Sequence, residues 1–192
     1  MAFLLEKIAN IRKTQNINVF LCGLRSSGKT TLLYKSLMND WHNICTEIEP
    51  TTLYHYEELH FGGMKYGIWD FSGDVKVRYI PAYVARQVQA TAVVYLVTGM
   101  EHSTTARNEM MDWIHSMERD DAFATSIFIV LFNKISPDEH SHSMEEYMKD
   151  NLLNKDRFLF LNVNVTLGLH DPNWVKALEI IRTHYKKHTT AS

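Results

Sequence analysis

One stretch of the chain places glycine, lysine and threonine at the spacing that holds phosphate groups. Residues 23–30 read GLRSSGKT, which fits the pattern G-x-x-x-x-G-K-[ST]. Gly23 and Gly28 allow the backbone to curl so that successive N–H groups face the phosphate oxygens. Lys29 supplies an ammonium group for the β- and γ-phosphates, and the hydroxyl of Thr30 is suited to Mg²⁺. These residues predict a nucleotide phosphate site, a P-loop, with Mg²⁺ beside it.

The segments on either side of this loop must hold it in place. Residues 17–22 (INVFLC) form a short apolar run that predicts a strand. Residues 29–38 have helical spacing, with Leu32 and Leu33 on the apolar side. A helix that starts at the loop directs its positive N-terminal end at a bound anion. The motif therefore lies in the strand–loop–helix context that its chemistry requires.

The rest of the chain alternates apolar runs with helical spacing, which is typical of a doubly wound α/β domain. Further strands are expected at residues 52–61, 64–70, 91–98, 126–132 and 158–163. Further helices are expected at residues 104–119, 144–153 and 174–187. Gly62 and Gly63 suit the positive φ angles of a tight hairpin turn. We therefore predict a six-stranded, mostly parallel sheet with one antiparallel hairpin and helices on both faces.

Composition excludes some broad classes of function. Lys and Arg number 20 against 22 Asp and Glu, so the formal charge is −2 and the basic excess of a nucleic-acid-binding protein is missing. No apolar run approaches the roughly 18 residues that a membrane-spanning helix needs. The first residues include Glu6 and Lys7, unlike a secretory signal. We therefore expect a cytoplasmic protein.

Cysteine and histidine do not predict a metal centre. Cys22 and Cys45 lack the spacing of metal ligands, and Cys22 ends an apolar run, so we expect it to be a small buried residue. His140 and His142 lie in a polar stretch without a converging partner, and we expect both to be solvated.

Further motifs follow the loop in a fixed order. The chain carries Pro50-Thr51, then WDFSG at residues 69–73, then Asn133-Lys134 after an expected strand. Together with the loop GLRSSGKTT, these motifs resemble the Arf and Arf-like branch of the small GTPases over nearly the whole chain. The resemblance implies a P-loop G domain with guanine nucleotide, GTP or GDP, and Mg²⁺ as its ligands.

The resemblance also assigns roles to single residues. Thr30 and Thr51 would bind Mg²⁺, Thr51 would sense the γ-phosphate, and Asp70 would act on Mg²⁺ through a water. The N–H of Gly73 would contact the γ-phosphate. All expected nucleotide contacts are Gly23, Leu24, Arg25, Ser26, Ser27, Gly28, Lys29, Thr30, Thr31, Thr51, Asp70, Gly73, Asn133, Lys134, Ser136 and Val165. Pro50-Thr51 would belong to switch I, residues 69–73 would open switch II, and the hairpin between them would be the interswitch. Arg78 and Tyr83 would lie in the switch II helix.

The same resemblance divides the chain into three parts. It implies an N-terminal amphipathic segment at residues 1–14, a G domain at residues 15–188 and a short tail at residues 189–192. Myristoylation needs Gly at position 2, and this chain has Ala2, so stable lipid anchoring is not expected. We favour packing of the first segment on the domain or on a protein partner over a membrane.

The position that would hold the water-orienting glutamine departs from the family pattern. Asp74 follows Gly73 there, and its shorter, charged side chain predicts slow or absent hydrolysis. Arg25 stands where Arf proteins usually carry Asp. Three interpretations stay open for Arg25: a contact with the γ-phosphate, an ion pair with Asp74, or a side chain pointing to solvent.

The residues expected to bind the base depart from the family pattern as well. Asn133 and Lys134 would frame the base, but Ser136 replaces the Asp that accepts two hydrogen bonds from guanine. Such charge-assisted bonds contribute roughly 1.5–3 kcal/mol each, so both affinity and discrimination against adenine should fall. Asp138 is two positions late for a substitute, and a backbone contact from Val165 to the base stays open.

Three functions fit these observations to different degrees. A GTP-dependent switch would act on protein effectors through switch I, the interswitch hairpin and switch II. A pseudo-GTPase would use the fold as a docking block in a larger assembly, with nucleotide permanently bound or absent. A small-molecule kinase would explain the loop alone. We expect an Arf-like GTP-binding protein with impaired hydrolysis, and a ciliary or cytoskeletal location is a further expectation from the same branch.

Overall fold

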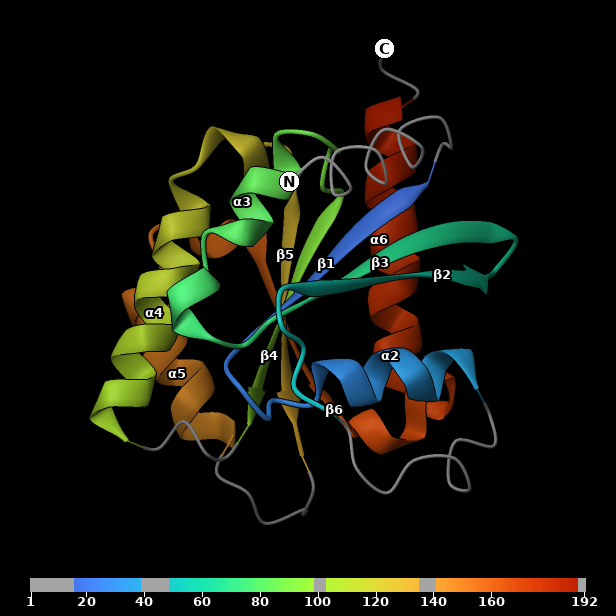
Figure 1. Cartoon of the computed structure of the whole chain (residues 1–192). Coiled ribbons are helices and arrows are strands. Elements are labelled where there is room, and N and C mark those ends of the chain that lie inside the picture. The colour runs from blue at the N-terminus through green and yellow to red at the C-terminus, as the bar shows by residue number, and fades with distance from the viewer. Residues whose placement is uncertain (1–15, 39–48, 99–102, 135–140, 190–192) are drawn as a thin grey trace.

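A single twisted sheet forms the centre of the molecule (Figure 1). The computed structural model describes residues 16–38, 49–98, 103–134 and 141–189. The strand order is β2-β3-β1-β4-β5-β6. The strands are β1 Ile17–Cys22, β2 Tyr54–Phe61, β3 Met64–Phe71, β4 Ala92–Thr98, β5 Ile127–Asn133 and β6 Phe158–Val163. Only β2 and β3 pair antiparallel in this sheet, which confirms the predicted architecture.

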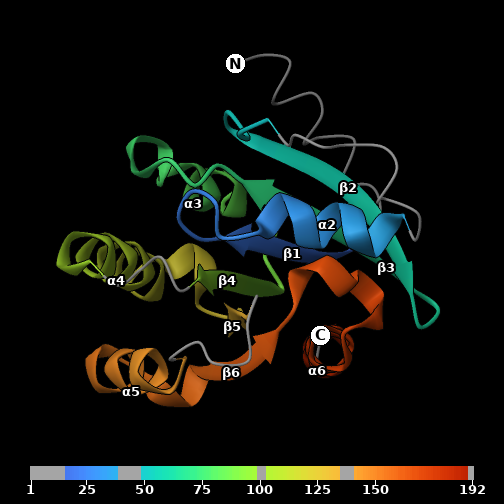
Figure 2. The same cartoon turned by 90° about the horizontal axis from the view of Figure 1, so that it is seen from below.

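Helices cover both faces of the sheet (Figures 1 and 2). One face carries α2 Lys29–Leu37 and α6 Pro172–Thr189. The other carries α3 Ile80–Ala85, α4 Thr104–Glu118 and α5 Ser141–Asn151. The layers follow from the strand sequences, because successive side chains of a strand point to opposite faces. In β4, Val93 and Tyr95 enter the core beneath α4, whereas Val94 and Leu96 enter the core beneath α6.

The parallel strands are buried on both faces, as their continuous apolar runs predict. Phe20 and Val130 are fully buried in the core on the α4 side, together with Met110 and Met117 of α4. The methionines of α4 are therefore core residues. Cys22 is also fully buried, and burial raises the pKa of its thiol well above the usual range, which fits the small apolar role expected for it.

The β2–β3 hairpin turns on two residues. Phe61 pairs with Met64, and between them Gly62 and Gly63 have φ angles of 57° and 74°. Both angles lie in the left-handed region that glycine adopts without strain, so the dipeptide produces the tight turn that the sequence predicts. The guanidinium of Arg182 in α6 donates to the carbonyl oxygen of Gly62 at 3.3 Å and ties the turn to the helix layer.

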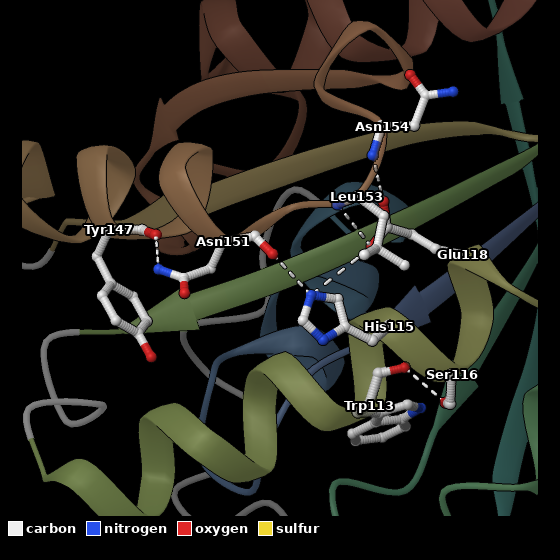
Figure 3. Close-up of polar contacts among 8 residues, drawn as sticks. All are labelled: Trp113, His115, Ser116, Glu118, Tyr147, Asn151, Leu153 and Asn154. Carbon is white, nitrogen blue, oxygen red and sulfur yellow. Dashed lines mark hydrogen bonds and ion pairs between the residues drawn. The ribbon is translucent and has the colours of Figure 1, made fainter.

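A buried carboxylate joins α4 to the turn that follows α5 (Figure 3). The side chain of Glu118 is 2% exposed and accepts hydrogen bonds from the backbone N–H groups of Leu153 at 3.4 Å and Asn154 at 3.1 Å. Nε2 of His115 lies 2.8 Å from the carbonyl oxygen of Asn151 and 3.9 Å from the Glu118 carboxylate. The contacts fix the end of α4 against the segment that leads into β6.

A side-chain cap sets the start of α6. α6 begins at Pro172, where the carboxylate of Asp171 accepts from the N–H groups of Asn173 at 2.9 Å and Trp174 at 3.0 Å. α5 begins three residues before the predicted helix at 144–153.

The expectation that Arg78 and Tyr83 share one helix is wrong for Arg78. The first turn of α3 contains Pro81, which lacks the N–H that would continue a helix from the preceding residues, so α3 starts at Ile80. Arg78 closes the preceding 3₁₀ turn, Val75–Val77, and Tyr83 lies in α3.

Candidate nucleotide site

The phosphate loop connects β1 to α2 through a tightly packed backbone. Gly23 has a φ of 140°, and a Cβ atom there would lie 2.4 Å from the carbonyl oxygen of Leu96 at the end of β4. Gly28 has a φ of 96°, and a Cβ atom there would lie 2.9 Å from Nδ2 of Asn133. Side chains at these positions would push the loop off the sheet, so the two glycines are required by packing as well as by conformation.

The lysine of the loop is held by its own neighbours. Nζ of Lys29 donates to the carbonyl oxygens of Gly23 at 2.8 Å and Leu24 at 2.9 Å, and to Oγ of Ser27 at 3.2 Å. The residue is 6% exposed. These oxygen acceptors hold the ammonium in position at the loop.

Three residues predicted for the Mg²⁺ site converge from different segments. Asp70 is the next-to-last residue of β3, Thr30 lies in the first turn of α2, and Thr51 precedes β2. Oδ2 of Asp70 accepts from the hydroxyls of Thr30 at 2.6 Å and Thr51 at 3.3 Å, and the two hydroxyl oxygens are 3.3 Å apart. The fold thus brings together three hard oxygen donors, the kind that Mg²⁺ prefers.

The second carboxylate oxygen of Asp70 suits a cation. The side chain is fully buried, and within the described chain Oδ1 accepts no hydrogen bond. Burial raises the pKa of Asp70, and the Thr30 hydroxyl and the Lys29 charge lower it in part. A buried carboxylate oxygen without a partner costs free energy unless a positive charge compensates it. The site therefore fits a Mg²⁺ ion held by Thr30, Thr51 and, through a water, Asp70.

The segment after β3 packs directly on the phosphate loop. A Cβ atom on Gly73 would lie 2.5 Å from the backbone nitrogen of Arg25 and 2.7 Å from the carbonyl oxygen of Leu24. Glycine is therefore needed there by close approach of the backbones. The packing places the N–H of Gly73 next to the cleft in which the resemblance expects a γ-phosphate.

Asp74 uses both carboxylate oxygens within the chain. Oδ1 accepts from the N–H of Lys76 at 2.9 Å and caps the 3₁₀ turn, and Oδ2 lies 2.6 Å from Nη2 of Arg25. The Lys76 N–H, and next the Arg25 charge, hold the pKa of Asp74 below its usual range. Of the three interpretations of Arg25, the structure contains the ion pair, although the Arg25 side chain is 68% exposed.

These segments line one cleft of about 420 Å³, within the size range of ligand sites. Its lining residues are Arg25, Ser26, Ser27, Gly28, Lys29, Thr30, Thr31, Glu49, Pro50, Thr51, Phe71, Ser72 and Gly73. The contacts expected from the sequence did not include Glu49, Pro50, Phe71 and Ser72. Pro50, Phe71 and Ser72 lie within two of the sequence motifs and Glu49 precedes one of them, so their signal was position alone.

Asn133 ties the base-side loops to the phosphate loop. Its side chain is almost buried, donates to the carbonyl oxygen of Ser27 at 3.4 Å and accepts from the N–H of Val165 at 3.4 Å. The N–H of Lys134 donates to the carbonyl oxygen of Val163 at 2.8 Å, which continues the β5–β6 ladder. The three predicted base-side residues that the structure describes, Asn133, Lys134 and Val165, thus meet at the same end of the sheet.

Several predicted features lie outside the described residues. They are the N-terminal segment at residues 1–14, Cys45, Ser136, Asp138 and His140. The expected loss of guanine selectivity at Ser136 stays a prediction.

None of the described helices combines the length and the apolar composition that crossing a membrane demands. The cytoplasmic and ciliary locations expected from the sequence stay predictions.

Comparisons with known proteins agree with this fold. A family model, the ADP-ribosylation factor family, matches residues 4–179. ADP-ribosylation factor-like protein 1 of Drosophila melanogaster is 25% identical over 134 residues, which is 70% of each chain. The solved structure of the Arl6 BBS3 small GTPase from Trypanosoma brucei, with the bound nucleotide analogue GppNp, superposes with a TM-score of 0.70 at 17% identity, covering 90% of this chain and 99% of that one. Because the family model matches most of its length, this chain belongs to the ADP-ribosylation factor family of small GTPases.

Proposed function

We propose that this protein binds GTP with Mg²⁺, hydrolyses it very slowly or not at all, and acts through contacts with protein partners. The observation that carries the proposal is the state of Asp74. It occupies the position of the water-orienting glutamine, and both of its oxygens are engaged, by the N–H of Lys76 and by Arg25.

The chemistry of hydrolysis explains why this matters. Phosphoryl transfer to water depends on positioning the attacking water and on stabilising negative charge on the γ-phosphate. Asp74 is shorter than glutamine, and its lowered pKa keeps it negatively charged at neutral pH. A carboxylate beside the γ-phosphate adds repulsion where stabilisation is needed, so the site favours holding the nucleotide over cleaving it.

Nucleotide binding is supported by residues on the other side of the site from Asp74. Lys29, Thr30, Thr51 and Asp70 provide the ammonium and the oxygen donors that a Mg²⁺–triphosphate requires. The similar Trypanosoma brucei structure carries the GTP analogue GppNp, and we extend guanine nucleotide to this chain.

Single-turnover hydrolysis of bound [γ-³²P]GTP tests the proposal. We expect the wild-type protein to retain its label, and Asp74→Gln to release phosphate about tenfold faster or more, since glutamine would restore the water-orienting group. Asp156→Gln makes the same change at an exposed position outside the cleft and should match the wild type. Wild-type turnover as fast as that of Asp74→Gln would contradict the proposal.

A second candidate is a pseudo-GTPase that carries no nucleotide and serves as a structural or adaptor subunit. It is favoured by the way Gly73 and Asp74 contact Leu24 and Arg25, because these contacts hold switch II on the phosphate loop with groups of the chain itself. Chromatography of nucleotide extracted from the purified protein separates the candidates. GTP supports the first, whereas protein that carries no nucleotide and binds none when it is added supports the second.

We place the partner surface on switch I, the interswitch hairpin and switch II. Leu53, just before β2, and Tyr79, just before α3, are 42% and 62% exposed. Exposed apolar side chains that flank a binding cleft are suited to a protein contact. Loss of partner binding on Tyr79→Ser, with nucleotide binding retained, would support this placement, and retained partner binding would refute the contribution of Tyr79.

A further inference from the structure

A second hollow lies beside the phosphate cleft, between switch II and the first turns of α4. It measures about 240 Å³. Leu24, Val75 and Ala106 give it an apolar lining, and Arg25, Asp74 and Glu109 place charges in it. We call it the α4 groove. Its volume is below the range of about 300–1,000 Å³ typical of sites for whole small molecules, and it suits a single long side chain.

The charges of the α4 groove do not balance. Arg25 pairs with Asp74 at 2.6 Å, and the other Asp74 oxygen accepts from the backbone of the 3₁₀ turn. Across the described part of the chain, Glu109 makes no hydrogen bond or ion pair. The nearby cation Arg107 is turned elsewhere, since its guanidinium carbon lies 5.5 Å from the centre of the Tyr147 ring on α5. One carboxylate therefore remains in excess in an apolar-lined groove.

We propose that the α4 groove binds the arginine or lysine side chain of a protein partner. The methylene stem of such a side chain would pack on Leu24, Val75 and Ala106. Its charged head would reach the carboxylate of Glu109, an arrangement that gives the stronger, charge-assisted kind of hydrogen bond. A bare metal ion fits less well, because hard cations need several oxygen ligands and Glu109 offers the one uncommitted carboxylate among the described lining residues.

Because the α4 groove adjoins the phosphate cleft, a cation bound in the groove would affect nucleotide binding. Arg25 and Gly73 line both the α4 groove and the phosphate cleft. A cation that enters the groove competes with Arg25 for Asp74, and a released Arg25 can turn towards the phosphates. Partner binding and triphosphate binding would then be linked. The proposal goes beyond the proposed function, since it requires neither hydrolysis nor its absence.

Benzamidine is a suitable probe, because it joins an amidinium cation to an apolar ring. In ¹⁵N NMR titrations of the full chain, we expect benzamidine to shift the amides of Val75, Ala106 and Glu109, and benzyl alcohol, its neutral counterpart, to leave them unshifted. Glu109→Gln should weaken the binding about three- to fivefold, as expected for a partly exposed ion pair. Glu179→Gln, the same change at an exposed position on α6, should have no effect.

Two results would overturn the proposal. One is equal binding of benzamidine and benzyl alcohol, and the other is equal binding of benzamidine to the wild type and to Glu109→Gln. The wild-type comparison needs no variant, so the test does not depend on the folding of Glu109→Gln. Higher salt should also weaken benzamidine binding, because partly exposed charges are screened, and unchanged affinity would again count against the groove. None of these readouts uses nucleotide turnover, so failure here is distinguishable from failure of the hydrolysis proposal.

Discussion

The two ends of the phosphate cleft differ in burial. At one end, Thr30 and Thr51 donate to Asp70, which is fully buried. At the other end, Arg25 pairs with Asp74 while the Arg25 side chain remains 68% exposed. Both ends contain a carboxylate, yet burial raises the pKa of Asp70, and hydrogen bonds and charge lower the pKa of Asp74.

The difference in burial explains which positions of the family motifs tolerate substitution. A buried polar network tolerates few substitutions, because a lost partner leaves a desolvated group unsatisfied. An exposed ion pair contributes little to stability and is screened by salt, so replacing its residues has little effect on the free energy of unfolding. The family residues Lys29 and Asp70 lie at the buried end, and the departures Arg25 and Asp74 lie at the exposed end. The two ends should therefore respond differently to substitution.

The largest effect is expected at Lys29. Lys29→Met removes the ammonium that faces the phosphates and three hydrogen bonds within the loop. Loss of two charge-assisted bonds at roughly 1.5–3 kcal/mol each should lower the affinity for a fluorescent GTP analogue by about 100-fold or more. Lys176→Met, on the exposed side of α6, is the matched control and should bind normally. Unchanged affinity of Lys29→Met would remove the loop from the nucleotide site.

The next effect concerns Asp70 and pH. Its folded-state pKa is raised, so the folded protein without Mg²⁺ binds more protons than the unfolded chain between the two pKa values. The contribution of Asp70 to stability is therefore greatest at low pH and is lost as pH rises from the unfolded pKa through the folded one. Mg²⁺ requires the ionised carboxylate, so Mg²⁺ affinity should rise over the same interval.

Thermal unfolding with EDTA and with Mg²⁺ between about pH 4 and pH 7 measures both trends, since the unperturbed Asp pKa is about 3.9. Asp70→Asn should bind Mg²⁺ about tenfold more weakly or worse and should lose the pH dependence of that affinity, because its amide does not titrate. Asp171→Asn, a buried Asp outside the cleft, should keep the pH dependence. A Mg²⁺ affinity that is independent of pH in the wild type would contradict the assignment.

Strand pairing explains why part of this site was predictable. Residues 17–22 and 158–163 were predicted at their observed bounds, because apolar runs bordered by loop residues leave little freedom. The Arg25–Asp74 pair was one of three alternatives, and the sheet register favours it. Leu21 pairs with Asp70 in the parallel β1–β3 register, and Arg25 and Asp74 follow these partners at the same distance along the chain.

Features that depend on contacts between distant segments were not predictable. The sequence does not show that Glu109 and Asp74 line one groove, because the approach of α4 to switch II is set by core packing. The 3₁₀ turn capped by Asp74 likewise depends on a side-chain hydrogen bond from the N–H of Lys76, which the sequence does not show. Local periodicity and the loop motif therefore predicted the sheet and the phosphate loop. They did not predict how the residues at the exposed end of the cleft are arranged.

A moderate effect is expected at Gly73, where the exposed end meets the loop backbone. Gly73→Ala places a Cβ atom 2.5 Å from the backbone nitrogen of Arg25, so switch II must move away. Strain of this kind costs about 1–3 kcal/mol, which should speed GTP release about tenfold. Gly63→Ala is a control for glycine replacement away from the phosphate loop, because no heavy atom would lie within 4 Å of the new Cβ and the strain from the φ of 74° falls on the hairpin turn alone. It should leave the release rate unchanged, and the same rate in Gly73→Ala would show that this packing is not needed for retention.

The smallest effect is expected at Arg25. If the exposed ion pair with Asp74 is its main contact, Arg25→Ala should change the rate of GTP release by no more than about twofold, in line with other exposed pairs. Arg25→Ala and Asp74→Asn should then have similar effects, and the double variant should add little, because each removes the same contact. A release rate raised tenfold or more in Arg25→Ala, but not in Asp74→Asn, would mean that Arg25 binds the γ-phosphate. In that case the exposed end would contribute to nucleotide binding as directly as the buried end does.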